Sequence, residues 1–106
     1  MTAADYRGRF CIDGGHPCLP GHFPGRPLVP GVVLLEQVAL ALRAWRGQRL
    51  ARVCEAKFVA PLKPGETAAL HLSEAAGRVR FDIRRDEVLV ARGVIEGATD
   101  EGAAAE

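Results

Sequence analysis

The stretch that decides the fold is GVVLLEQVALALRAW, residues 31–45. Its only polar side chains are Glu36, Gln37 and Arg43. Pro30, just before it, suits a first helical turn, where a missing N–H costs nothing. A helix on a protein surface shows one apolar stripe, whereas this segment is apolar on every side. The stretch therefore predicts a helix that is covered all round.

Segments of strand type follow and precede this helix. Residues 78–84 alternate, with Val79, Phe81 and Ile83 predicted to face inward, and 88–96 is apolar almost throughout, which is typical of a strand covered on both faces. The predicted strands are 7–13, 52–60, 67–74, 78–84 and 88–96. Together they predict an α+β domain over 1–97, a curled antiparallel sheet around one long helix. The tail 98–106 has nothing to bury and is predicted to be disordered.

The predicted sheet is too small for its helix. Five short strands cannot enclose a helix that is apolar all round, and a monomer that exposed the rest would tend to aggregate. A second copy of the chain would supply the missing cover. A homodimer or a larger assembly is therefore predicted.

Composition excludes several classes of function. The chain has 106 residues, 25% of them charged, and a formal net charge of +1, so its bulk charge favours neither nucleic acid nor a membrane as a partner. No apolar run reaches the roughly 18–20 residues of a transmembrane helix, and the N-terminus lacks a signal-peptide core. Cys11, Cys18 and Cys54 suit neither a disulfide framework nor a metal site. A cytoplasmic protein without a metal is predicted.

The second informative stretch is GHFPGRPLVPGVVLLE, residues 21–36. Three prolines and three glycines in its first eleven positions make a rigid loop around His22, and the apolar run after them ends on Glu36, fourteen residues later. The residues predicted to shape this loop are Phe23, Pro24, Pro27 and Pro30.

These residues resemble a known signature. GHFPGRPLVPGVVLLEQV is similar to the motif of the hot-dog 3-hydroxyacyl-[acyl-carrier-protein] dehydratases of the FabZ/FabA type, and EAKFVAPLKPGE (55–66) continues the likeness. The resemblance implies a hot-dog fold, His22 and Glu36 as catalytic residues, an acyl carrier protein as partner and no cofactor. The compact length resembles the small dehydratases of aryl-polyene and related pathways. One departure is Leu40, where the family usually has Gln.

The chemistry of dehydration fits the same residues. Loss of water from a 3-hydroxyacyl thioester needs a base for the α-proton, an acid for the departing hydroxyl and a way to hold enolate charge. Neutral His22 can be the base, and Glu36 in apolar surroundings would be available as a proton donor or as the anchor of the hydroxyl. The first N–H groups of the helix, those of Gly31 and Val32, would bind the thioester oxygen.

Spacing along the helix suggests how the pair meets. Glu36 lies five residues past Gly31, about 7–8 Å along the axis at 1.5 Å per residue. His22 of the same loop would not share a small reacting centre with Glu36 unless the loop folded back. In a dimer, His22 of one chain could face Glu36 of the other.

Other charged residues are assigned by position. An acyl carrier protein is typically acidic, and Arg26, Arg43 and Arg46 are predicted to contact it at the mouth of the tunnel. His16 is predicted to lie at the surface or rim of its loop. His71 is out of phase with its apolar neighbours, which predicts the opposite face of the sheet.

Two other functions remain open. A hot-dog thioesterase would use a helix carboxylate to activate water and would not need the His-Phe-Pro loop. A non-catalytic acyl-binding subunit would keep the pocket without turnover.

Overall fold

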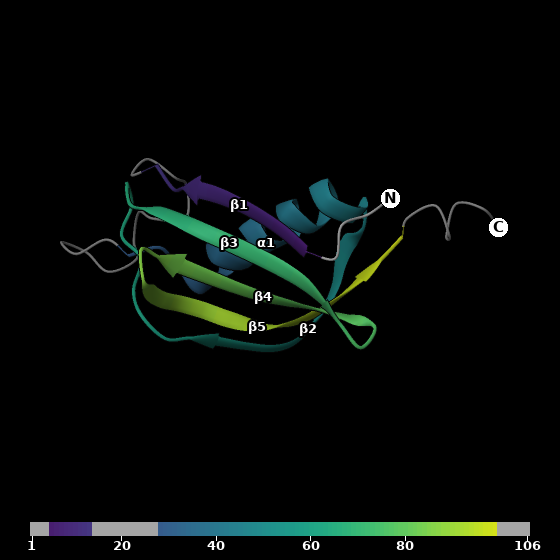
Figure 1. The fold of residues 1–106 in the computed structure, drawn as a ribbon. Coiled ribbons are helices and arrows are strands. Elements are labelled where there is room, and N and C mark those ends of the chain that lie inside the picture. Colours follow the sequence, from purple (N-terminus) through teal and green to yellow (C-terminus); the bar gives the residue numbers. More distant parts are fainter. Residues whose placement is uncertain (1–4, 14–27, 100–106) are drawn as a thin grey trace.

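The structure is a computed structural model that describes residues 5–13 and 28–99. That part of the chain forms one helix and five strands (Figure 1). In chain order they are β1 (Asp5–Cys11), α1 (Gly31–Arg46), β2 (Arg49–Phe58), β3 (Thr67–Ala75), β4 (Arg78–Arg85) and β5 (Val88–Ala98). All six predicted elements are confirmed. β2 begins at Arg49 rather than at 52, and β5 continues to Ala98, into the segment predicted as a tail.

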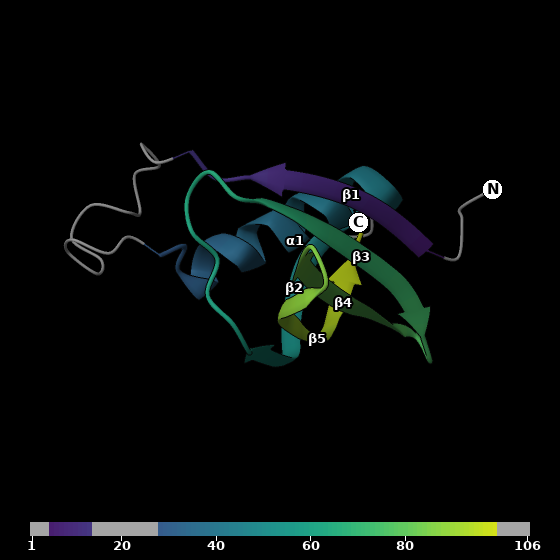
Figure 2. The same cartoon turned by 60° about the vertical axis from the view of Figure 1, so that its left-hand side comes forward.

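The strands form a single antiparallel sheet in the order β1-β3-β4-β5-β2. The helix α1 lies across one face of this sheet, which we call the inner face, and the opposite face is the outer face (Figures 1 and 2). In the sequence, α1 stands between the two edge strands, β1 and β2. The hot-dog fold predicted from the sequence, a curled sheet around one helix, is confirmed.

Strand direction defines two ends of the sheet. Each strand is antiparallel to its neighbours, so β1, β4 and β2 all run the same way. Their last residues, Cys11, Arg85 and Phe58, therefore lie at one end, which we call the proximal end. The ring of Phe58 lies against Gly31, so the start of α1 is also at the proximal end.

The core lies between α1 and the inner face. In β3 and β4 alternate residues are buried, and in α1 the buried residues recur at helical spacing. Burial of apolar surface stabilises by about 25 cal/mol per Å², so these side chains contribute most of the stability. The fully buried ones of largest volume are Phe81, Leu42, Leu62, Leu72, Ile83, Ile95, Val33, Val38 and Val90.

The prediction for the last strand was half right. β5 does lie inside the sheet, between β4 and β2, but Arg92 on its outer face is exposed, so the strand is not covered on both faces within the protomer. A register shift opposite Ile83 and Arg84 leaves two successive residues, Val90 and Ala91, both buried. Such a bulge breaks the alternation and lengthens the apolar run in the sequence.

A glycine allows close packing on the same strand. A Cβ added at Gly93 would lie 2.1 Å from the carbonyl oxygen of Glu55 on β2 and 2.7 Å from the Phe81 ring. No side chain fits there without displacing the backbone of β2. Gly93 therefore lets the edge strand β2 and the core ring of Phe81 approach β5 together.

Candidate functional site

The first turn of α1 offers unused N–H groups. Pro30 is the N-cap, with φ −65° and ψ 152°, and its carbonyl accepts hydrogen bonds from the N–H groups of Val33 (3.0 Å) and Leu34 (3.3 Å). The N–H groups of Gly31 and Val32 are too close to the start of the helix to find a carbonyl acceptor within it, so the helix itself leaves them available. They lie at the positive end of the helix dipole and can bind a negatively polarised oxygen.

The segment before the helix is fixed to the sheet connection. The N–H of Val29 donates to the carbonyl of Leu62 over 2.8 Å, and Val29 and Leu62 are both buried. The N–H groups of Val59 and Ala60 both donate to the carbonyl of Val90. These main-chain hydrogen bonds help to hold the start of α1 and the chain after β2 side by side.

An apolar hollow of about 300 Å³ opens between these two segments. The Phe58 ring forms part of its wall above Gly31, and a Cβ at Gly31 would lie 2.8 Å from the ring's Cζ atom. Phe58 and Val59 are 50% and 59% exposed in the protomer. The hollow is lined by Leu28, Val29, Pro30, Gly31, Leu34, Phe58, Val59, Ala60, Pro61 and Leu62. An acyl group beside the Gly31 N–H would find apolar surface here.

Sequence reasoning did not single out the β2 side of this hollow. Phe58 and Val59 are in the segment 55–66 that carried part of the family resemblance, but that segment was given no role. The sequence did offer one signal for this wall: an aromatic residue, Phe58, and a β-branched residue, Val59, stand shortly before Pro61, where the strand must end. Their place against Gly31 depends on the register of β2, which the sequence does not reveal.

Glu36 is exposed in the protomer. The prediction that apolar side chains enclose it is therefore wrong for a single chain. It shares one face of α1 with Val32 and Leu40, four residues to either side, and these are 66% and 59% exposed. Glu36 thus lies in the middle of an open apolar strip, which we call the open strip (Val32, Glu36, Leu40).

The residue after Glu36 points to a different place. Gln37 is half-buried and lines a second hollow of about 250 Å³ between α1 and β1, together with Tyr6, Phe10 and Leu40. Leu40, the position where the family usually has Gln, therefore borders both this hollow and the open strip. Gln37 is the amide nearest to Glu36 along the described part of the helix.

Several predicted residues lie outside the described part of the chain. These are His16, His22, Phe23, Pro24, Arg26 and Pro27. Of the predicted site, the structure brings Pro30, Gly31, Val32 and Glu36 onto the first two turns of one helix. The meeting of His22 with Glu36 stays a prediction.

The predicted carrier contacts on the helix lie at its other end. Arg43 and Arg46 follow Gly31 by twelve and fifteen residues, about 18 and 22 Å along the axis. The Arg46 guanidinium pairs with Glu74 of β3 and lies 4.0 Å from the centre of the Trp45 ring. Arg46 therefore fastens the last turn of α1 to the sheet, and Arg43 is exposed.

His71 lies on the outer face, as predicted. Its Nε2 atom is 3.2 Å from Asp5 of β1 and its Nδ1 atom 3.9 Å from Asp82 of β4. The inner-face residues Leu70 and Leu72 on either side of it are buried. His71 is thus on the far side of the sheet from Glu36.

Residues 5–13 and 28–99 contain neither a metal-ligand cluster nor a membrane-spanning helix. No cluster of three or more His, Cys, Asp or Glu side chains there could hold a metal ion. The helix found there, with 16 residues, is not long and apolar enough to cross a membrane.

Comparison with known proteins adds a family to this geometry. The family model for ApeI-like proteins, described as ApeI dehydratase, matches residues 2–94. The 3-hydroxyacyl-[acyl-carrier-protein] dehydratase FabZ of Haemophilus influenzae is 37% identical over 71 residues, 58% of this chain and 48% of that protein. FabZ of Bradyrhizobium sp. strain ORS 278 is 30% identical over 106 residues, 83% of this chain and 70% of that protein. The chain spans about half the length of several curated relatives that it matches.

Solved structures share the fold. The dehydratase heterocomplex ApeI:P from Xenorhabdus doucetiae contains a chain that superimposes with a TM-score of 0.78 at 24% identity, covering 90% of this chain and 88% of that one. A mutant of the fluoroacetyl-CoA-specific thioesterase FlK gives a TM-score of 0.66 at 13% identity, covering 99% and 93%. Likeness at these identities concerns the fold alone, which a dehydratase and a thioesterase here have in common.

Proposed function

Because the chain belongs to the ApeI-like dehydratase family, we propose that it removes water from a 3-hydroxyacyl thioester carried on an acyl carrier protein, which gives the trans-2-enoyl thioester. The observation that carries this proposal is the first turn of α1. The helix leaves the N–H groups of Gly31 and Val32 unused, and Gly31 borders an apolar hollow of about 300 Å³. A carboxylate, Glu36, follows on the same helix.

In this reaction the two N–H groups bind the thioester oxygen and stabilise the enolate that forms when the α-proton leaves. His22 takes that proton from C2. Glu36 gives a proton to the hydroxyl at C3, so the C–O bond breaks and water departs while the C2–C3 double bond forms. Phe58 and Val59 provide apolar surface for the acyl chain.

A homodimer completes this site. The open strip leaves Glu36 at the protomer surface between two exposed apolar side chains, Val32 and Leu40. A second chain laid over the strip would remove water from Glu36 and bring its own loop to it, so that His22 of one chain faces Glu36 of the other. A closed two-fold pair then contains two equivalent sites.

The metabolic setting is proposed from the family. The chain serves fatty-acid synthesis or a polyketide-like pathway of the aryl-polyene type, the two settings that its sequence resemblance implies. The solved ApeI:P structure is a heterocomplex, so a different subunit is the second candidate for covering the open strip. A thioesterase is supported only by the fold shared with FlK.

The first test is turnover. The purified chain is given a 3-hydroxyacyl thioester, and enoyl absorbance and free-acid release are followed in parallel. Glu36→Gln keeps the shape of the side chain but has no proton to give, so it should lower turnover about 10²–10⁴-fold. Glu87→Gln, the same change at an exposed residue of the β4–β5 turn, is the matched control and should leave turnover unchanged.

A mixing experiment tests whether the site crosses between chains. His22→Ala and Glu36→Gln are each expected to be inactive alone. When the two are mixed and reassorted, each mixed dimer holds both lesions in one site and none in the other, so activity should return to about a quarter of wild type. No recovery would place both residues within one chain. Free acid in place of enoyl product would mean a thioesterase.

A further inference from the structure

The outer face of the sheet carries more positive charge than its acidic residues can balance. The basic residues on it are Arg7, Arg9, Arg49, Arg52, Lys57, Arg78, Arg80, Arg84 and Arg92, and the acidic ones are Asp5, Glu55, Asp82 and Glu96. The whole chain has a net charge of only +1. Positive charge in the described strands is therefore concentrated on the face that α1 does not cover.

The acidic residues of this face are mostly engaged already. Asp5 lies 4.0 Å from Arg7 and 3.2 Å from His71, and Asp82 lies 3.9 Å from both His71 and Arg84. Glu96 lies 3.0 Å from Arg78 on the same face. Ion pairs between described residues use none of the cations Arg9, Lys57, Arg80 and Arg92. Four positive side chains are left for a partner.

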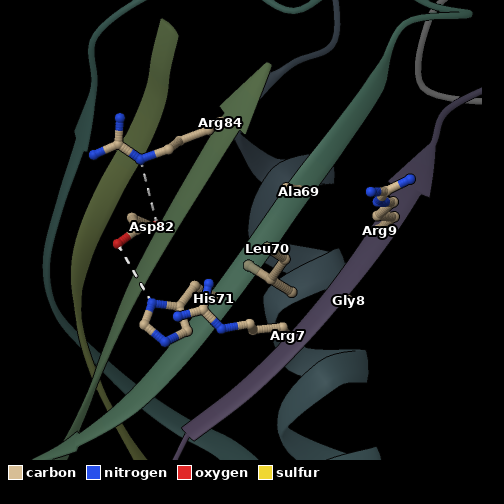
Figure 3. Close-up of a pocket in the computed structure, with 8 residues that line it drawn as sticks. All are labelled: Arg7, Gly8, Arg9, Ala69, Leu70, His71, Asp82 and Arg84. Carbon is tan, nitrogen blue, oxygen red and sulfur yellow. Dashed lines mark ion pairs between the residues drawn. The ribbon is translucent and has the colours of Figure 1, made fainter. Parts of the chain in front are cut away.

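Two of the arginines border a hollow. Arg9 of β1 and Arg84 of β4 lie on either side of Ala69 of β3, in direct register with it, two strand spacings or about 10 Å apart. The small side chain of Ala69 leaves a hollow of about 410 Å³, with Arg7 and His71 on its other side (Figure 3). Arginine offers a planar fork of donors that fits a carboxylate, so the hollow suits an acidic side chain placed above Ala69.

A second hollow, also of about 410 Å³, adjoins the first. Arg84 and Asp82 line both, and Arg80 and Arg92 border the second one. The two hollows together extend from β1 across to β5. Each exposed ion pair alone contributes little binding free energy, so a single small anion would bind weakly here. A surface this wide instead fits several acidic side chains of one protein, whose ion pairs add up.

The position of these residues relates them to the proposed site. Arg9 is two residues before the end of β1, Arg84 is next to the end of β4, and Lys57 is next to the end of β2, so all three lie at the proximal end of the sheet. The start of α1 and the hollow beside Gly31 are at the same end. Arg43 and Arg46, in contrast, are at the other end of α1.

We propose that the outer face at the proximal end, centred on Arg9, Arg84 and Arg92, docks the acidic surface of the acyl carrier protein. This rests on the proposed function, which makes a carrier-linked thioester the substrate. The carrier binds on one side of the sheet, and its prosthetic arm passes the proximal rim to reach the first turn of α1. Docking is electrostatic and therefore weakens as salt is added.

Binding without turnover is the test. The affinity of a fluorescently labelled bacterial holo acyl carrier protein for the full chain is measured by anisotropy at several salt concentrations. The variant Arg9→Glu/Arg84→Glu should weaken binding at low salt at least about tenfold and flatten the salt dependence. Arg9→Gln/Arg92→Gln, which leaves the Asp82–Arg84 pair intact, should weaken it less but in the same direction, and a thermal melt checks that both variants fold.

The matched control is Arg43→Glu/Arg49→Glu. It changes the net charge by the same amount at the opposite end of α1 and the start of β2, and carrier affinity should change less than about twofold. An equal or greater loss in this control would overturn the proposal, as would unchanged affinity in the two outer-face variants. Displacement of the carrier by short duplex DNA of equal total charge would also overturn it, because the face would then bind any polyanion.

A second readout separates this proposal from the proposed function. Turnover of a 3-hydroxyacyl pantetheine thioester, which has no carrier protein, should be the same in wild type and in the outer-face variants. If wild type forms no enoyl product while carrier binding follows the expected pattern, the dehydratase function fails and the docking surface stands. If wild type turns over this small substrate but carrier affinity is unchanged in the outer-face variants, only the docking surface fails.

Discussion

The two sides of α1 have similar sequences and different surroundings. Val33, Leu34, Val38 and Leu42 are almost fully buried against the sheet, whereas Val32 and Leu40 on the open strip are largely exposed. Both sides are rich in Val and Leu, but only the open strip carries a carboxylate, Glu36. The buried side therefore builds the fold, and the open side is apolar for a reason outside the protomer.

The largest effect is expected on the buried side. Leu42→Ala removes a fully buried side chain and should destabilise the protein by about 2–5 kcal/mol, measured as the free energy of unfolding in urea. Leu40→Ala, on the open strip, should lower the free energy of unfolding of the dissociated chain much less, because Leu40 is largely exposed there. Equal losses at low protein concentration would mean that the two sides of the helix do not differ as described.

The next effect concerns assembly. Leu40→Glu places a second carboxylate one turn after Glu36, so a chain covering the open strip would have to bury two like charges. Sedimentation should show a shift toward monomer, with turnover falling in parallel. Val88→Glu, which also adds one negative charge at an exposed apolar residue but at the start of β5, is the control. A Leu40→Glu variant that stays fully assembled would show that the strip is not the interface.

A smaller effect is expected at the first turn. Gly31→Ala puts a Cβ 2.8 Å from the Phe58 ring, so the ring must move and the hollow change shape. Overpacking of this kind typically costs about 1–3 kcal/mol. When Phe58 is already Ala, the clash is gone, so the double variant Gly31→Ala/Phe58→Ala should have a free energy of unfolding at least as high as that of Phe58→Ala alone. A double-mutant cycle measures this coupling, and additive losses would contradict the contact.

The smallest effect is predicted for the far end of the helix. Arg46→Ala removes the pair with Glu74 and the contact with the Trp45 ring, and should cost about 1 kcal/mol because the pair is partly exposed. Catalysis on a small thioester should be unaffected, since Arg46 lies about 22 Å from Gly31 along the helix. A thermal melt and a turnover assay together test this, and lost turnover in a folded variant would contradict it.

The sequence predicted the elements well because their patterns are local. Alternation in β4 and the uninterrupted apolar run of α1 determine strand and helix, and all six elements were found. The sequence does not reveal which side of α1 is left open, because both sides are apolar. The exposure of Glu36 and the contact of Phe58 with Gly31 depend on how the sheet curves and on the bulges in β2, which are non-local.

The strand order also has a consequence for the order of folding. β3, β4 and β5 are joined by tight turns, whereas the paired residues of β1 and β3 are 56 to 68 residues apart in the sequence, from Cys11 with Thr67 to Asp5 with Ser73. Those of β2 and β5 are 33 to 49 residues apart, from Phe58 with Ala91 to Arg49 with Ala98. Local pairings close first because their loops cost less entropy. We therefore expect the β3–β4–β5 meander to form early and the two edge strands to dock late. Those edges carry Arg9, one of the residues proposed to meet the carrier, and Phe58, which is proposed to contact the acyl chain. Both therefore belong to the last and most readily opened part of the sheet, whereas Arg84 and Arg92 lie in the early meander.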